Sequence, residues 1–119
     1  MITVKMSDAL MGDICHYHSD MYGYEEGEMD EWFSPECQSF VNKTMKTSRS
    51  YRRGRGVFHE VEATQDEVSA VIDEIVKVWI TDYDDRADYS FCAEERRQLR
   101  AIVRQYKKFV EQYTAEVGE

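Results

Sequence analysis

Residues 57 to 80 read Val-Phe-His-Glu-Val-Glu-Ala-Thr-Gln-Asp-Glu-Val-Ser-Ala-Val-Ile-Asp-Glu-Ile-Val-Lys-Val-Trp-Ile, and the period of the apolar residues changes within them. Up to Ala63 the side chains alternate between two faces, which is typical of a half-buried strand. Thr64 and Glu67 have the spacing of a capping box, in which each side chain bonds a free N–H at the start of a helix. Apolar residues then recur every three or four positions as far as Trp79. We therefore expect a strand over residues 57–63, followed directly by a helix with one buried face.

The N-terminal half predicts a second strand and two further helices. Residues 2–6 alternate apolar and polar side chains, and we expect this strand to pair with residues 57–63. Ser7 is placed to cap a helix that runs to about Tyr22. Ser34-Pro35-Glu36 is a favourable start for a short helix that ends near Lys46. The intervening residues 24–31 carry many carboxylates and indicate a solvated loop.

The remaining segments are expected to be two loops and one long helix. Residues 47–56 lack periodicity and contain two glycines, which predicts a loop or turn leading into the strand. Residues 82–89 interrupt the apolar pattern, and Ser90 is placed to cap a final helix. The buried face of that helix is predicted to consist of Leu99, Ile102, Val103, Tyr106, Phe109, Val110 and Tyr113.

These elements predict an α+β fold in a single domain over residues 1–119. About four helices would pack on a small sheet of at least two strands, with the last two helices forming an antiparallel hairpin. An all-α fold with minor strands is the alternative. The chain has 119 residues, of which 42% are hydrophobic and 13% aromatic, so it can build a core without metal or disulfide support.

The location expected from the sequence is the cytoplasm. No run of about 20 apolar residues is present, which argues against a membrane-spanning helix. The first residues lack the charged start and apolar block of a signal peptide. The three cysteines are an odd number at irregular spacing, so we expect free thiols and no disulfide framework.

Charge is strongly segregated along the chain. The formal net charge is −9, which opposes binding of the molecule as a whole to nucleic acid or anionic lipid. By blocks, residues 1–36 sum to −8, residues 37–59 to +6 and residues 60–119 to −7. A basic segment therefore lies between two acidic ones, and this is the main clue to function.

The basic segment supports one functional hypothesis, a nucleic-acid-binding module. Its cations would hold phosphates, and Tyr51 would stack on a base. The competing interpretation is that these cations pair with the protein's own carboxylates. The candidate residues are Lys43, Lys46, Arg49, Arg52, Arg53 and Arg55, joined by Arg97, Arg100, Arg104 and Lys108 on the polar face of the final helix.

The acidic segments support the leading hypothesis, a non-enzymatic protein that docks on a protein partner as an inhibitor or regulator. Carboxylates on a small domain complement a basic surface, such as that of a nucleic-acid-handling complex, and neighbouring aromatic residues favour interfaces. The partner-binding candidates are Tyr24, Glu25, Glu26, Glu28, Asp30, Glu31, Trp32, Asp82, Asp84 and Asp85.

A small enzyme or metal-binding protein is the remaining alternative. Cys15, His16 and His18 invite a metal or thiolate interpretation, with Cys37, His59 or Cys92 completing a site, but no second metal-ligand pair of suitable spacing exists. Residues 82–88 resemble a calcium loop but carry Arg86 and Ala87 where a ligand and a glycine are needed. We therefore expect no metal, no cofactor and no catalytic residue.

In size, acidity and absence of a catalytic signature, the chain resembles the small proteins that bacteriophages encode to inhibit host machinery. Anti-CRISPR proteins and restriction inhibitors are among them. The resemblance is one of composition and is carried by no individual motif. It implies a non-enzymatic inhibitor that acts by occupying a protein partner.

Overall fold

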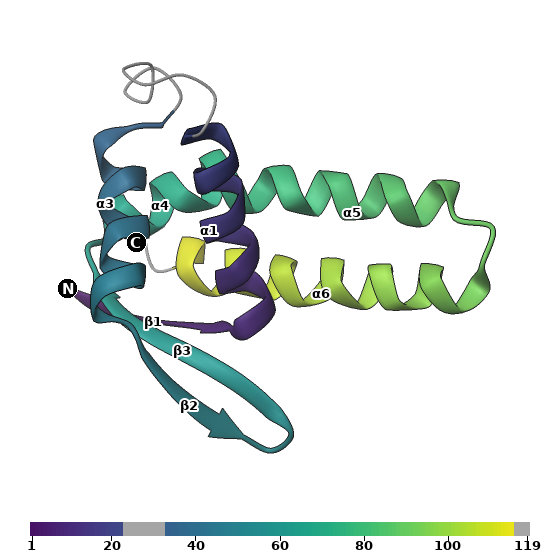
Figure 1. Cartoon of the computed structure of the whole chain (residues 1–119), viewed down its shortest axis with the longest axis horizontal. Helices are drawn as coiled ribbons and strands as arrows, with labels where there is room; N and C mark the ends of the chain where they lie inside the picture. The colour runs from purple at the N-terminus through teal and green to yellow at the C-terminus, as the bar shows by residue number, and fades with distance from the viewer. Residues whose placement is uncertain (23–32, 116–119) are drawn as a thin grey trace.

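The computed structural model describes residues 1–22 and 33–115, and it has the predicted α+β architecture (Figure 1). In chain order the elements are β1 (Ile2–Ser7), α1 (Asp8–Tyr22), α3 (Pro35–Thr47), β2 (Arg49–Arg53), β3 (Gly56–Ala63), α4 (Gln65–Val71), a π-helical turn η1 (Ile72–Val76), α5 (Lys77–Tyr89) and α6 (Ala93–Ala115). Because α4, η1 and α5 follow one another without a break, they form one long helix. The described part of the chain thus contains four helices and a small sheet.

The sheet is antiparallel, with strand order β1-β3-β2. The predicted pairing of the first strand with residues 57–63 is confirmed, since Val4 lies opposite Val61 and Met6 opposite His59. The prediction of a loop over residues 47–56 is wrong for Arg49–Arg53, which forms the edge strand β2. This strand gives no periodic signal because it carries no buried side chain, so polar and charged residues occupy both of its faces.

The predicted helix starts are confirmed at three positions. The Ser7 hydroxyl accepts a hydrogen bond from the Leu10 N–H at 3.2 Å. The Ser34 hydroxyl accepts one from the Cys37 N–H, also at 3.2 Å, with Pro35 in the first turn. Thr64 and Glu67 complete the capping box, in which the Glu67 carboxylate accepts the Thr64 N–H at 2.8 Å. Local polar side chains therefore fix where these helices begin.

The predicted loop over residues 82–89 is wrong, because the long helix continues to Tyr89. No Gly or Pro stops it, and Tyr83 and Ala87 extend the inward-facing row of Trp79 at intervals of four. Ser90 ends this helix instead of capping the next one, which starts at Ala93. The acidic residues of this region are therefore held on a rigid helix and not in a flexible loop.

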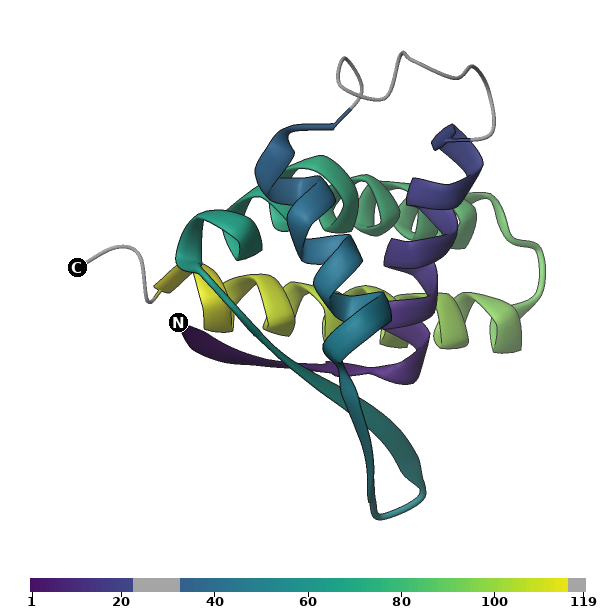
Figure 2. The same cartoon turned by 60° about the vertical axis from the view of Figure 1, so that its left-hand side comes forward.

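The core lies between the sheet and the helices. Figure 2 shows α1 and α3 side by side, and both pack against the long helix. The predicted inward face of α6 is confirmed for six of its seven residues. Val103, Tyr106, Phe109 and Tyr113 are buried, and Ile102 and Val110 pack partly buried against the core, whereas Leu99 is not part of it. The Tyr113 hydroxyl accepts a hydrogen bond from the Lys5 N–H at 2.7 Å, so α6 contacts the free edge of β1 at this position.

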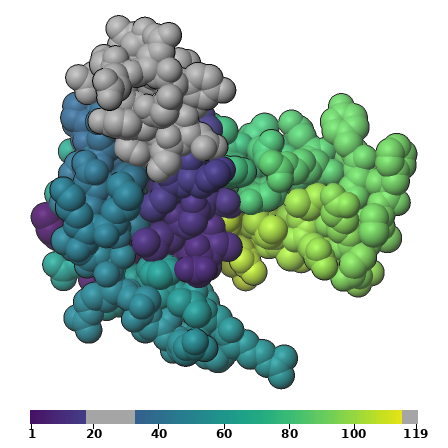
Figure 3. Space-filling model, viewed as in Figure 1, coloured from purple at the N-terminus to yellow at the C-terminus, as the bar shows by residue number. Residues whose placement is uncertain are grey.

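The predicted antiparallel hairpin of the last two helices is also confirmed. Its outer part, residues 81–102, projects from the body of the molecule and is called the arm below (Figures 1 and 3). The opposite end of α6 packs on the core beside β1. Among the described residues, no helix is both long enough and apolar enough to cross a membrane.

Candidate binding sites

A groove of about 560 Å³ lies between the β2–β3 hairpin and α6. In Figure 1 the hairpin extends below α6, which forms the other wall. Three cations line the groove, Lys5 from β1, Arg53 from β2 and Lys108 from α6, and none of its lining residues is acidic. We call it the cationic groove. Its apolar floor includes Met6, Leu10 and Phe109.

A stacked aromatic pair forms part of the groove wall. Tyr51 lies opposite Phe58 in the β2–β3 register, and their ring centroids are 5.8 Å apart with 25° between the planes. A Cβ atom at Gly56 would lie 2.9 Å from the Phe58 ring, so only glycine leaves room for the ring. Gly54 has a φ of 63° and makes the tight turn. The two glycines thus shape the hairpin that presents the aromatic pair.

Most cations of the basic segment make no ion pair with the residues that the structure describes. Lys43 is the exception, since its Nζ lies 2.7 Å from the Glu67 carboxylate. The other five are exposed and make no ion pair with any residue that the structure describes: Lys46, Arg49, Arg52, Arg53 and Arg55. Among the described residues, pairing with carboxylates therefore explains Lys43 but not the hairpin arginines.

The basic face of α6 divides into two parts. At the arm end, Arg100 lies 2.9 Å from Asp88 and 3.7 Å from Asp84, and Arg97 lies 3.2 Å from Glu94. Further along, Arg104 has no ion pair within the described ranges, and Lys108 lines the cationic groove with Arg53. Of the α6 cations proposed from the sequence, Lys108 is the one that meets the hairpin in this groove.

The acidic candidates on the arm are largely balanced by their neighbours. Asp82 pairs with Arg86 at 2.8 Å, and Asp84 faces Arg100. Asp85 is exposed and has no ion pair among the residues described. The other acidic and aromatic candidates lie outside the described residues: Tyr24, Glu25, Glu26, Glu28, Asp30, Glu31 and Trp32.

The end of the arm carries exposed aromatic residues that the sequence argument did not select. Tyr89 is 82% exposed and Phe91 is fully exposed, and Cys92 beside them is exposed as well. Residues 89–92 are called the arm tip below. The sequence does contain a pattern that indicates their exposure. The helical rows of apolar residues end at Ala87 and resume at Leu99, and Tyr89 and Phe91 lie between them.

The thiols and imidazoles do not assemble into a reactive centre in the described residues. Burial, reinforced by the nearby Glu74 charge, raises the pKa of the Cys37 thiol to about 12. Burial also raises the pKa of Cys15, so both thiols are protonated at neutral pH. His59 is engaged by Asp8 at 2.7 Å. Within the described ranges, no three His, Cys, Asp or Glu residues are arranged to hold a metal ion.

A polar network joins the base of the arm to α1. The Asp13 carboxylate accepts hydrogen bonds from the hydroxyls of Tyr83 at 2.7 Å and Tyr106 at 2.5 Å, and the Asp13 carbonyl accepts the Trp79 indole N–H at 3.0 Å. Burial and the Asp13 carboxylate raise the pKa of Tyr83 to about 12, and the same causes raise the pKa of Tyr106. The hydroxyls therefore stay protonated and act as structural donors.

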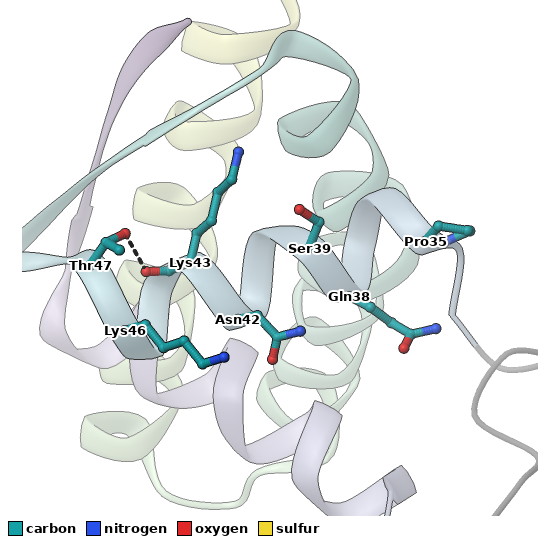
Figure 4. A pocket seen from close by; sticks show the side chains of 7 residues that line it. All are labelled: Pro35, Gln38, Ser39, Asn42, Lys43, Lys46 and Thr47. Atoms are coloured by element: carbon teal, nitrogen blue, oxygen red, sulfur yellow. Dashed lines mark hydrogen bonds between the residues drawn. The ribbon is translucent and has the colours of Figure 1, made fainter.

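The outer face of α3 offers a shallow depression of about 440 Å³, shown in Figure 4. Its lining side chains all come from this one helix. Four of them are already engaged. Ser39 and Lys43 bind the Glu67 carboxylate, Thr47 donates to the Lys43 carbonyl at 2.7 Å, and Gln38 donates to the Phe33 carbonyl at 3.0 Å. The depression is an open helix face without convergent groups.

Comparisons of the chain with protein-family models, curated proteins and solved structures found no match.

Proposed function

We propose that the protein is a non-enzymatic binding protein that docks on a protein partner and acts as its inhibitor or regulator. The arm tip is the observation that carries this proposal. Tyr89 and Phe91 expose almost their entire side chains at the end of a projecting helical hairpin. Buried aromatic anchors supply most of the binding energy in many interfaces, and Tyr is among the residues enriched at such hot spots.

The arm holds its tip in a defined position. Arg100 bridges Asp84 and Asp88 of α5, and the Arg86 guanidinium lies over the Tyr83 ring at 5.3 Å. Ala87 is fully buried between these contacts. A tip presented by paired helices loses little conformational entropy on docking, which favours affinity.

The charge of the molecule supports a basic partner surface. A net charge of −9 steers the protein toward positively charged surfaces, which are common on nucleic-acid-handling complexes. Asp85 and Glu95 are exposed near the tip and make no ion pair among the described residues, whereas Glu94 is paired with Arg97. The three free thiols suit a reducing compartment, so the proposed site of action is the cytoplasm.

The proposal is tested by capture of the partner from the native host with three forms of the protein. These are the unmodified chain, the double variant Tyr89→Ala and Phe91→Ala, and the control Met45→Ala, which removes a 54% exposed side chain on α3. The captured partner is then purified, and its Kd is measured for each form. We expect the double variant to bind at least about 30-fold more weakly and the control to bind like the unmodified chain.

Two results would overturn the proposal. One is equal retention of the same partner by the unmodified chain and the double variant, which would place the interface elsewhere. The other is the recovery of no partner by the unmodified chain.

A further inference from the structure

We propose that the cationic groove is a binding site for single-stranded nucleic acid. Phosphates would lie against Lys5, Arg53 and Lys108, and a base would stack against the Tyr51–Phe58 pair. The site lies between the β2–β3 hairpin and α6, whereas the arm tip is at the opposite end of α6. A ligand in the cationic groove would therefore leave the arm tip free for a protein partner, and the two sites can be tested separately.

The charge of the groove is the first argument. The chain has 24 acidic and 15 basic residues, yet the groove gathers three cations and no carboxylate. Lys5, Arg53 and Lys108 come from three elements far apart in sequence, and none has an ion pair within the described part of the chain. Glu60 lies opposite Lys5 in the β1–β3 register, but it makes no ion pair with Lys5 and does not line the groove. The excess of positive charge along the groove favours an anionic ligand.

The hairpin carries further exposed arginines beside the groove. Arg55 lies in the turn next to Arg53, whereas Arg52 points to the opposite face of β2 and Arg49 lies opposite Glu60. A ligand that carries one charge at regular intervals along a chain can leave the groove at Arg53 and continue past Arg55. This is the charge pattern of a nucleic-acid backbone.

The aromatic pair distinguishes a nucleic acid from other polyanions. Tyr51 and Phe58 are stacked with only 25° between their planes and are partly exposed, so they offer a flat surface for a base. Gln105 and Gln112 on the α6 wall add amide groups that can bond a base edge. The carboxylate side chains of an acidic peptide would pair with the cations but offer no ring to stack on this pair.

The size of the groove favours a single strand. Its volume of about 560 Å³ falls within the range of about 300–1,000 Å³ that proteins use for small ligands. That is room for one or two nucleotides and not for a duplex. In a duplex the bases are paired and stacked on each other, and they cannot reach a ring pair inside a groove.

The test is a binding titration with a fluorescein-labelled oligothymidine of about 12 nucleotides, followed by anisotropy at about 50 mM and about 200 mM salt. Lys108→Gln removes a cation from the groove. Lys107→Gln is the matched control, because Lys107 is the exposed neighbouring residue of α6 and does not line the groove. Tyr51→Leu removes one stacking ring and keeps an apolar side chain.

We expect the unmodified protein to bind with a micromolar Kd at the lower salt concentration. Lys108→Gln should weaken binding about three- to tenfold and reduce the salt slope by about 0.7, while Lys107→Gln stays within about twofold. Tyr51→Leu should weaken binding roughly tenfold with little change in the salt slope. The arm-tip variant Tyr89→Ala and Phe91→Ala should bind the oligonucleotide normally, so this test and that of partner docking fail independently.

The inference is overturned by any of three results. The first is the absence of oligonucleotide binding at the lower salt concentration. The second is an equal loss of affinity in Lys108→Gln and Lys107→Gln, which would indicate general charge attraction. The third is stronger binding of an acidic peptide or of a duplex than of the single strand, because it would reassign the groove to another ligand.

Discussion

Arginines of the arm and arginines of the β2–β3 hairpin have the same chemistry but opposite surroundings. In the arm, Arg86 and Arg100 are each paired with carboxylates of α5. In the hairpin, Arg52 lies opposite Val57 and Arg53 opposite Gly56, so the neighbouring strand offers them no carboxylate. A basic run in a sequence therefore gives the charge of a segment, whereas the register of its neighbours decides whether that charge is available to a ligand.

The largest expected loss of stability comes from breaking the hydrogen bonds that join the base of the arm to α1. Asp13→Ala would leave the hydroxyls of the partly buried Tyr83 and the buried Tyr106 without their acceptor, and we expect the free energy of unfolding to fall by about 3 kcal/mol. Urea unfolding measures the change. Asp13→Asn keeps a carbonyl acceptor and should cost less. A loss below about 1 kcal/mol in the alanine variant would show that the network does not secure the arm.

The next largest change in stability concerns Lys43, the one cation of the basic segment with an ion pair among the described residues. Burial alone would raise the pKa of Glu67, but hydrogen bonds from Lys43, Ser39 and Thr64 outweigh it and lower the pKa from 4.5 to about 2. Since the lowered pKa belongs to the folded state, the stabilisation is complete above the unfolded value and is lost as the pH falls toward 2.

This contribution is measured by urea unfolding at about pH 6 and about pH 3. Glu67 should account for roughly 3 kcal/mol of the stability of the unmodified protein at the higher pH, and most of that is lost on acidification. Glu67→Gln has no carboxylate to protonate, so its stability should depend less steeply on pH over this range. Equal slopes in the two proteins would contradict the assignment.

A smaller change in the free energy of unfolding distinguishes the arm arginines from the hairpin arginines. Arg100→Ala removes a half-exposed cation that bridges two carboxylates and should lower the free energy of unfolding by about 0.5–1 kcal/mol, with the difference shrinking at high salt. Arg53→Ala should change it by less than about 0.5 kcal/mol, because its side chain has no ion pair within the described residues. The two variants are compared by urea unfolding at low and high salt. A larger loss in Arg53→Ala would mean that the hairpin arginine has a structural role.

Much of the fold could be predicted because its signals are local. Ser7, Ser34 and Thr64 cap helices within three residues of themselves, and the strand and helix periods around Val61 and Val68 depend only on near neighbours. Those elements and the β1–β3 pairing are confirmed. The strand Arg49–Arg53 escaped prediction because an exposed edge strand needs no apolar alternation.

The candidate sites were harder to predict because they depend on tertiary structure. The cationic groove joins Lys5, Arg53 and Lys108, which no sequence pattern connects. The end of the long helix was missed because Asp82, Asp84 and Asp85 suggested a solvated loop, although helices tolerate such residues when arginines face them. The exposure of Phe91 likewise depends on tertiary structure, because it lies in the turn between α5 and α6.

The central claim, that the hairpin arginines are available to a ligand and the arm arginines are not, is tested most directly by two triple variants. Arg52→Ala, Arg53→Ala and Arg55→Ala together remove the same charge as Arg86→Ala, Arg97→Ala and Arg100→Ala together. Oligothymidine affinity and the free energy of unfolding are measured for both. The hairpin variant should lose at least about tenfold in affinity and keep its stability, while the arm variant should keep its affinity within about threefold and lose about 1–2 kcal/mol of stability. Equal losses of affinity in the two variants would contradict the claim.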